Sequence, residues 1–427
     1  MGNHEWDKRR SGRLAVRSSC RGNVGENGES RRSGPAGMAK HRTGVNYGEA
    51  TMQIDMQYYG VYAMARAAGL TKEASAQIAT ASELVDDNAE EEHVEFGDGG
   101  RLDLMPTAHH TTDIENRDEE MQRKVWVPFH FIPGNRGRTV AERLVCRKDS
   151  AIARESVDHA VRMANRAFGP QLLGITAHVY ADTFSHYGFS GASCPVNRVN
   201  TGESGPVEDD EAASEARRSR GKFAAAGDVE HEGGGNWWTD MTEHLVAGIA
   251  EAASGALGHA GVATWPDKPF LVWTAVFEHE VPAREMRQHR DNPKTFLEGC
   301  RALHRMFCKV GREAPHLRER VPTRFADLEE RVKGILATVG DKGVRSDAWK
   351  AAAIDGVFAG AQEEIPPYGG HDWLGTLEDW RSRQGTDRAV RSQEVVESDT
   401  FRFYQAAAIH RTFVLRDLLP THGLAVN

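Results

Sequence analysis

The sequence contains few cysteines and no long apolar run. Its five cysteines among 427 residues include no CxxC pair, which argues against a disulfide framework and against a thiolate zinc knuckle. Reduced thiols are typical of a cytoplasmic protein, and we predict that location. No run of 18 or more apolar residues occurs, and the first residues lack the apolar core of a signal peptide. The sequence therefore predicts neither a membrane span nor export by a signal peptide.

Several catalytic motifs are also missing. The sequence has no Gly-rich phosphate loop, no GxSxG and no HExxH, which argues against nucleotide-binding folds, serine hydrolases and zincins. The formal net charge of -9 argues against a protein that coats duplex nucleic acid through its overall charge. What remains is an ordinary soluble composition, with 39% hydrophobic and 27% charged residues.

Composition divides the chain into three kinds of segment. Residues 1–50 are rich in Arg, Gly and Ser with scattered apolar residues, and we predict a disordered leader. Residues 195–235 mix charges with glycines, and we predict a flexible acidic and Gly-rich insertion. Residues 51–194 and 236–427 are predicted to form one helical domain.

Hydrophobic periodicity in that domain is mostly helical, so the predicted fold class is all-α, a multi-helix bundle. A helical hairpin is expected over 52–88, and an Ala-rich helix is expected to end at Ala260. Residues 124–137, a β-branched and aromatic run broken by prolines, are expected to be an extended cover, and GGHDW at 369–373 is expected to be a loop. Further helices are expected over 149–169, 292–310, 323–338, 347–358 and 399–419.

The segment Gln171–Gly191 carries the main chemical signal. His178, Asp182 and His186 are spaced four residues apart among apolar neighbours. On an α-helix each step of four residues turns the side chain by only about 40°, so the three would share one face about 12 Å long. Imidazole and carboxylate groups are the ligands that hold zinc and similar divalent ions. The spacing therefore predicts part of a metal site, which other segments must complete.

The candidates for those further ligands lie at the ends of predicted helices and in loops. Asp55 has an open alternative as a helix N-cap, and Asp86 or Asp87 ends the predicted hairpin. His130 stands between Phe129 and Phe131, which favours a hydrogen-bonded core histidine over a ligand. The predicted metal ligands are His178, Asp182, His186, Asp55, Asp87, His109 and His259, and Asp267 is a further candidate beside His259.

Several stretches together resemble an uncharacterised bacterial family. They are MQIDMQYYGVYAMARAAG, PTAHH, VWVPFHFIPG, LLGITAHVYADTFSHYGFSG and GHAGVATWPDKPF. The resemblance runs from Met52 to the last predicted helix. The family's opening reads Asp-x-His-Tyr-Tyr, and this sequence has Gln57 in place of the histidine. If that histidine is a ligand in the family, this chain has lost one coordination position, because Gln is a poor zinc ligand beside imidazole.

At a remoter level the HxxxD element looks like that of the zinc-dependent phospholipase C and single-strand nuclease superfamily. This resemblance implies an all-α fold, zinc bound by His, Asp and Glu side chains, and hydrolysis of phosphodiesters. The chain departs from that superfamily at two points. Its last histidine, His186, comes sooner after the HxxxD element, and the N-terminal Trp that ligates metal through its backbone amine has no counterpart.

Two hypotheses of different classes follow. The first is a divalent-metal-dependent hydrolase of phosphate esters or phosphodiesters that uses a metal-bound hydroxide, with zinc favoured and manganese or iron as alternatives. Its substrate would be a small molecule or a nucleic-acid phosphodiester. The second is a helical metal-binding or interaction protein without turnover, in which the same residues stabilise the core. A third hypothesis is that Gln57 marks an inactive relative retained for interaction.

Overall fold

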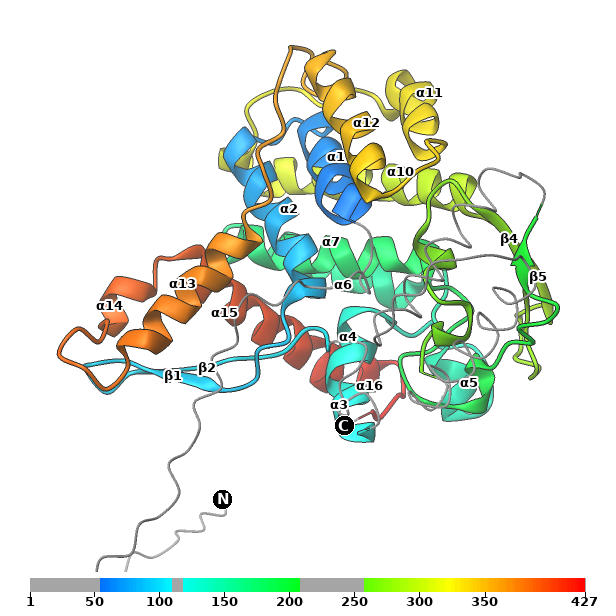
Figure 1. The fold of residues 1–427 in the computed structure, drawn as a ribbon, viewed down its shortest axis with the longest axis horizontal. Coiled ribbons are helices and arrows are strands. Elements are labelled where there is room, and N and C mark those ends of the chain that lie inside the picture. The colour runs from blue at the N-terminus through cyan, green and yellow to red at the C-terminus, as the bar shows by residue number, and fades with distance from the viewer. Residues whose placement is uncertain (1–53, 110–117, 208–256, 427) are drawn as a thin grey trace, which may run out of the picture. The chain divides into compact units, whose positions relative to one another are not determined.

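The computed structural model describes residues 54–109, 118–207 and 257–426 (Figure 1). The predicted leader lies outside these residues. So do residues 208–256, which include most of the predicted insertion and of the Ala-rich helix. Within the described ranges, no helix combines the length and the apolar character needed to cross a membrane.

The first described elements form the predicted helical hairpin. A π-helical segment, Asp55–Gly60, leads into α1, Val61–Ala67, and a tight turn leads to α2, Lys72–Asp87. The Thr71 hydroxyl caps α2 by accepting a hydrogen bond from the Ala74 amide at 3.1 Å. The prediction of a hairpin is therefore confirmed.

Helix α7, Gly169–Ser185, is the centre of the fold (Figure 1). Nearly every residue in it is buried, as expected of a helix that is apolar on all sides. It packs against α2, against α6, Ala151–Arg162, against α10, Asn292–Glu313, and against α15, Asp399–Thr412. Polar side chains on α7 are consequently enclosed by other helices.

Helices α2 and α7 approach each other closely at Gly174. A Cβ atom at this position would lie 2.3 Å from the carbonyl oxygen of Ile78 and 3.0 Å from the amide of Ser82. Any larger residue would push the two helices apart. This close contact brings the C-terminal half of α2 against the face of α7 that carries His178 and Asp182.

The remaining elements are mostly short or peripheral. The other helices are α3, Glu119–Met121; α4, Val127–Phe129; α5, Val140–Leu144; α11, Phe325–Leu336; α12, Lys342–Ile354; α13, Gly370–Arg383; α14, Ser392–Val395; and α16, Leu419–Thr421. A π-helical segment, Phe413–Leu418, joins α15 to α16. The prediction of a mostly helical fold is thus confirmed.

The prediction of an all-α fold holds only in part, because two small antiparallel sheets accompany the helices. One pairs β1, His93–Glu95, with β2, Arg101–Asp103. The other has the order β3-β4-β5, with β3 at Gly205–Pro206, β4 at Val272–Val276 and β5 at Arg287–Asp291. Trp273 and Arg290 are partners across β4 and β5, and both side chains are fully buried. The sequence of β5, RQHRD, has no strand-favouring residues, so its pairing with β4 decides its conformation.

Two local predictions are also corrected. Residues 124–137 were expected to be extended, but Gln122–Trp126 form a π-helical segment that continues into α4. Pro128 is the second residue of α4, and Trp126, which precedes the helix, is already in the right-handed helical conformation. The GGHDW stretch, expected to be a loop, instead begins α13 at Gly370.

Residues 195–207 are the part of the predicted insertion that the structure describes. Pro195–Asn197 form a 3-10 turn, and the side chain of Asn197 donates to the carbonyls of Ser190 and Ala192 at 2.9 Å. The amide of Val207 donates to the carbonyl of Val272 beside β4. Residues 195–207 therefore belong to the folded part of the chain.

Candidate metal centre

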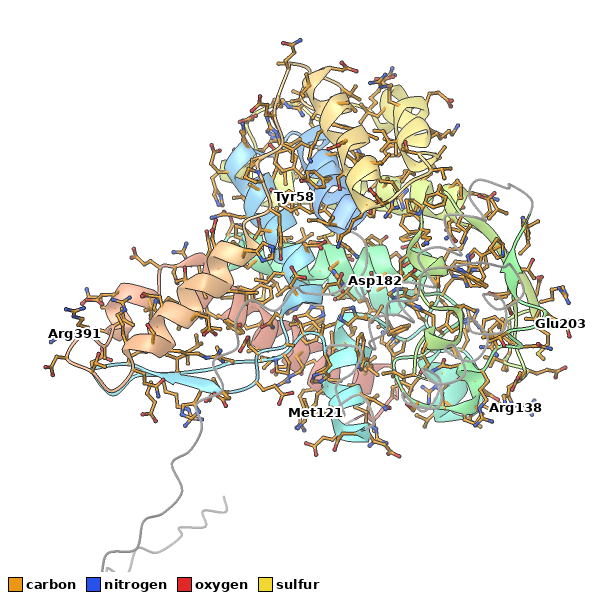
Figure 2. The ribbon with its side chains drawn as sticks, viewed as in Figure 1. Tyr58, Met121, Arg138, Asp182, Glu203 and Arg391 are labelled. Atoms are coloured by element: carbon orange, nitrogen blue, oxygen red, sulfur yellow. The ribbon has the colours of Figure 1, made fainter. Side chains whose placement is uncertain are left out.

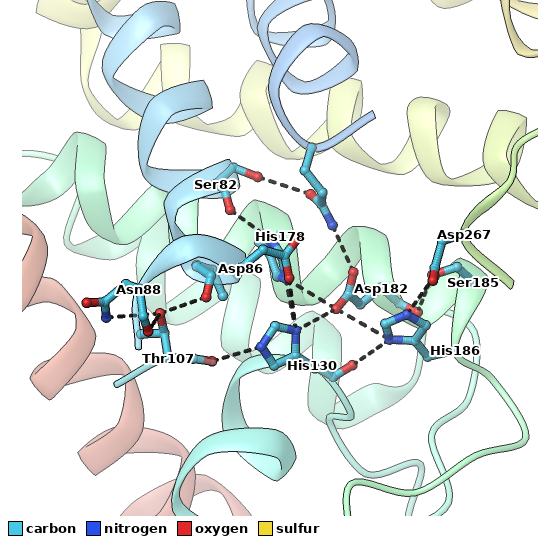
Figure 3. Close-up of polar contacts among 12 residues, drawn as sticks. Ser82, Asp86, Asn88, Thr107, His130, His178, Asp182, Ser185, His186 and Asp267 are labelled. Carbon is cyan, nitrogen blue, oxygen red and sulfur yellow. Dashed lines mark hydrogen bonds and ion pairs between the residues drawn. The ribbon is translucent and has the colours of Figure 1, made fainter. Parts of the chain in front are cut away.

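Helix α7 presents His178 and Asp182 on one face, and His186 follows directly after its last residue (Figure 3). All three side chains are buried, with 0% of Asp182 exposed. Figure 2 likewise places Asp182 in the interior, whereas Arg138 and Glu203 lie at the periphery. The predicted face therefore exists, and it points into the protein.

A first cluster forms where α2 and the end of α4 meet this face. Asp86 is on α2, His130 follows α4, and the ligand atoms of Asp86, His130 and His178 lie within 4.8 Å of one another. The Nδ1 of His130 is 3.2 Å from the Nε2 of His178. The Oδ1 of Asp86 lies 3.6 Å from the first nitrogen and 3.7 Å from the second.

Backbone carbonyls fix the tautomers of both histidines in this cluster. The Nδ1 of His178 lies 2.8 Å from the carbonyl oxygen of Ser82, and the Nε2 of His130 lies 2.8 Å from that of Thr107. A carbonyl oxygen can only accept, so these two nitrogens donate. In the neutral rings the other two nitrogens are then lone-pair acceptors that face each other. Two facing lone pairs need a shared cation or proton between them.

A second cluster consists of His186, His259 and Asp267. The Nε2 of His186 is 3.0 Å from Asp267 Oδ1, and the Nε2 of His259 is 3.7 Å from Asp267 Oδ2. The other ring nitrogen of each histidine again meets a carbonyl. The Nδ1 of His186 lies 3.1 Å from the oxygen of His130, and that of His259 lies 2.7 Å from the oxygen of Ala263.

Asp182 lies between the two clusters (Figure 3). Its Oδ2 is 3.3 Å from His178 Nε2, 3.5 Å from His130 Nδ1 and 3.4 Å from His186 Nδ1. This oxygen accepts no hydrogen bond from the described part of the chain. Its Oδ1 accepts a hydrogen bond from Gln57 Nε2 at 2.8 Å. One carboxylate oxygen is thus held by an amide, while the other faces histidines of both clusters.

The electrostatics of the centre are those of crowded, buried charges. Burial, together with Glu83 and Asp182, raises the pKa of Asp86 well above its ordinary value. Burial also acts to raise the pKa of Asp182, but His178 and His186 hold it below its ordinary value. For His186, burial is outweighed by Asp182 and Asp267, which raise the pKa to about 9. Burial lowers the pKa of His130. Carboxylates buried at this density are stable only with a cationic partner or a bound proton.

The structure brings together four of the residues predicted from the sequence, namely His178, Asp182, His186 and His259, and places Asp267 beside them. His259 lies just before a 3-10 turn, Ala260–Val262, and Asp267 ends a second one, Trp265–Asp267.

Three other predicted ligands lie elsewhere. Asp55 is no N-cap, because its buried carboxylate pairs with the Arg345 guanidinium through contacts of 2.9 and 3.1 Å. Asp87 accepts a hydrogen bond from the Tyr368 hydroxyl at 2.7 Å. His109 is buried, with its Nδ1 at 3.7 Å from Glu91.

Two residues of the first cluster were not among the predicted ligands. Asp86 was named only as an alternative to Asp87, although it follows Ile78 and Ser82 at four-residue spacing on the buried face of α2. That spacing is the signal that separates it from its neighbour. His130 was predicted as a hydrogen-bonded core histidine. It does bond Thr107, but its second nitrogen faces His178.

Comparisons with known proteins give a family and no individual relative. No curated protein and no solved structure matches the chain. A family described as a family of unknown function, DUF6765, matches residues 52–418. This confirms the prediction from the sequence that the chain resembles an uncharacterised family. The match spans well over half of the chain, and the protein therefore belongs to this family.

Proposed function

We propose that the two clusters form a divalent-metal centre and that the protein is a metal-dependent hydrolase of phosphate esters or phosphodiesters. One observation supports this most strongly. Four histidines, three of them buried and His259 partly exposed, each have one ring nitrogen against a backbone carbonyl, so the other nitrogen is turned toward carboxylates. Carbonyl contacts of this kind orient metal-ligating histidines and fix their tautomer. A core that needed only satisfied polar groups would gain nothing from two lone pairs 3.2 Å apart.

The donor atoms fit zinc and similar ions. Each cluster offers two imidazole nitrogens and one carboxylate oxygen, and Asp182 Oδ2 lies 3.3 Å from His178 Nε2 of the first cluster. Imidazole with carboxylate suits zinc, manganese and iron, whereas a site for magnesium or calcium would consist mainly of oxygen donors. Zinc is the favoured ion, because four histidines are available and imidazole with carboxylate is a common ligand set for zinc.

A bound divalent ion would supply a water of lowered pKa and would withdraw charge from a phosphoryl oxygen. The residues of the chain have the complementary task of holding the donors in place and keeping bulk water out. Gln57 holds one oxygen of Asp182, and the Ser82 carbonyl holds His178. The remote resemblance of the HxxxD element to the zinc-dependent phospholipase C superfamily supports the same reaction class.

A second candidate function is a metal-stabilised helical protein without turnover, and the burial of the ligands favours it. Structural metal sites are closed, whereas catalytic sites keep one position open. Two surface cavities, one lined by Asp158 and Phe413 and the other by Val140 and Val426, contain none of the ligand residues.

Hydrolysis of a generic phosphodiester, bis(p-nitrophenyl) phosphate, separates the two functions. The purified protein should hydrolyse it in the presence of zinc or manganese, and Asp182→Asn should abolish turnover. His371→Ala, at an exposed histidine on α13, is the matched control and should keep full activity. Bound metal without any phosphoester hydrolysis would favour the structural role, and activity that survives Asp182→Asn would place the reaction elsewhere.

A further inference from the structure

The two clusters differ in how far they are closed off from solvent. In the first cluster the exposed fractions of the Asp86, His130 and His178 side chains are 4%, 3% and 0%. In the second cluster His186 and Asp267 are similarly buried, but the His259 side chain is 18% exposed. Among the described ligand side chains of the two clusters, His259 is therefore the most exposed to solvent.

The two clusters also differ in what holds their ligands. Asp86 and His178 are on the long, packed helices α2 and α7, so releasing either one requires two core helices to separate. His259 is in a loop, directly after Gly258, which has a φ of 53°. The amide of Gly258 donates to the carbonyl of Ser190, and a Cβ at Gly258 would lie 2.6 Å from Phe131 Cζ. A loop of this kind opens at a much lower free energy than a packed helix pair.

Phe131 links this loop to the second cluster. Its ring stacks on His186 with centroids 4.7 Å apart, and it lies 5.9 Å from the ring of His259. The position of His259 therefore depends on the left-handed conformation of Gly258 beneath the Phe131 ring, a conformation that glycine adopts without strain.

We infer that the two clusters bind separate metal ions of unequal exchange. Asp86, His130 and His178 hold a slowly exchanging ion, and His186, His259 and Asp267 hold a readily exchanged ion at the side from which a phosphate ester would enter. The inference rests on the metal centre proposed above and assigns each cluster a role. Asp182 Oδ2 faces His130 Nδ1 in the first cluster and the Nδ1 of His186, a ligand of the second, so its carboxylate lies between the two ions.

Release of Zn²⁺ from the full-length protein tests this directly. The protein is loaded with Zn²⁺, the bound equivalents are counted, and release to an excess of a chromogenic chelator is followed over time. We expect two phases of equal amplitude, with release rates about tenfold or more apart. The reason is that the loop opens locally at a lower free energy than the packed helices of the core. His259→Ala should lose the fast phase and keep the slow one. Release of all Zn²⁺ in one phase would overturn the inference.

A second variant leaves every ligand in place. Gly258→Ala should weaken the fast-exchanging site about 10-fold or more, because the new methyl group strains the backbone and meets Phe131. Gly99→Ala is the matched control, since Gly99 has a φ of 83° but nothing within 4 Å of an added Cβ. It should leave both phases unchanged. If Gly258→Ala changed the Zn²⁺ release rates of both phases equally, the two sites would not be separate.

The outcomes also separate this inference from the proposed function. Two phases of Zn²⁺ release without hydrolysis of any phosphoester would contradict the proposed hydrolase function. The inference of two unequal metal sites would still hold. Hydrolysis by a protein that binds a single equivalent of Zn²⁺ would support the hydrolase function. It would overturn the inference that the two clusters bind separate ions. Circular dichroism spectra of each variant show whether it folds, and the two-phase release of the unaltered protein decides the question if a variant does not fold.

Discussion

Gln57 is the residue whose role the structure changes most. From the sequence it marks a lost histidine and a weakened site. In the structure it is fully buried, its Nε2 donates to Asp182, and its Oε1 accepts from the Ser82 hydroxyl at 3.1 Å. The Ser82 hydroxyl thereby sets which end of the amide faces the carboxylate. Gln57 positions Asp182, and the hypothesis of an inactive relative stays a prediction.

Replacing Gln57 tests this positioning role. Gln57→Leu removes the donor to Asp182 at nearly constant volume, and we expect the affinity for Zn²⁺ to fall about 10- to 100-fold, as for other residues that orient metal ligands. Competition with a chelator measures the change. Gln77→Leu is the control, because Gln77 Nε2 also donates to an aspartate, Asp399, but away from the centre. Activity that appears only in Gln57→His would instead support an inactive relative.

His410 gives the protein a defined sensitivity to acid. Burial lowers the pKa of His410 to about 4, and its Nε2 donates to the carbonyl of Pro128. The unfolded chain binds a proton at an ordinary pKa near 6.5, so the folded state loses stability as the pH falls from about 6.5 toward 4. Between pH 7 and pH 5 this amounts to about 2 kcal/mol.

The corresponding prediction concerns His410→Gln, which can still donate to the carbonyl but does not titrate. Urea unfolding at pH 7 and pH 5 should show that the variant loses about 2 kcal/mol less stability than the unaltered protein. His371→Gln, at an exposed position, should change this difference little. An identical loss in the His410 variant and the unaltered protein would contradict a buried neutral imidazole.

At the level of elements, the end of α7 depends on a strand that is remote in sequence. Arg290 on β5 is fully buried, and its guanidinium donates to the carbonyls of Ser185 and Tyr187, on either side of His186. A cation at a helix C-terminus satisfies carbonyls that have no helical partner. Strand β5 therefore fixes the point at which α7 ends and His186 turns into the second cluster.

Removing that guanidinium should be costly. Arg290→Met leaves the two carbonyls without a charged donor, and we expect the free energy of unfolding to fall by about 3 kcal/mol. Arg287→Met on the same strand is the control. The Arg287 side chain is 60% exposed and pairs with an exposed glutamate, so its loss should cost less than about 1 kcal/mol. Urea unfolding compares the two, and equal effects would contradict the role given to Arg290.

The sequence predicts the elements best where periodicity is long. The hairpin of α1 and α2, helix α7 and helix α10 can all be predicted from the spacing of their apolar residues and from the residues at helix ends. Segment 122–129 and strand β5 are not, because tertiary contacts decide both. Val125 and Phe129 are fully buried in a helical segment despite strand-like composition, and the polar β5 is a strand because β4 pairs with it.

For the whole molecule, the candidate centre is built from segments that lie far apart in the sequence. Its residues run from Gln57 to Asp267, and only His178, Asp182 and His186 share a local pattern. The approach of α2 to α7 at Gly174 brings Asp86 to the first cluster, and no spacing rule links residue 86 to residue 178. The sequence could therefore predict the central triplet, and helical spacing on α2 favours Asp86 over Asp87, but no pattern assigns His130 to the centre.

The metal content of the purified full-length protein tests the central claim most directly. After equilibration with Zn²⁺ and removal of free ion, elemental analysis should find about two equivalents per chain, one for each cluster of nitrogen and oxygen donors. The double variant His178→Ala with His186→Ala should bind less than about half an equivalent, while the control His371→Ala keeps the full content. Less than about one equivalent of zinc, manganese or iron in the unaltered protein would contradict the metal centre.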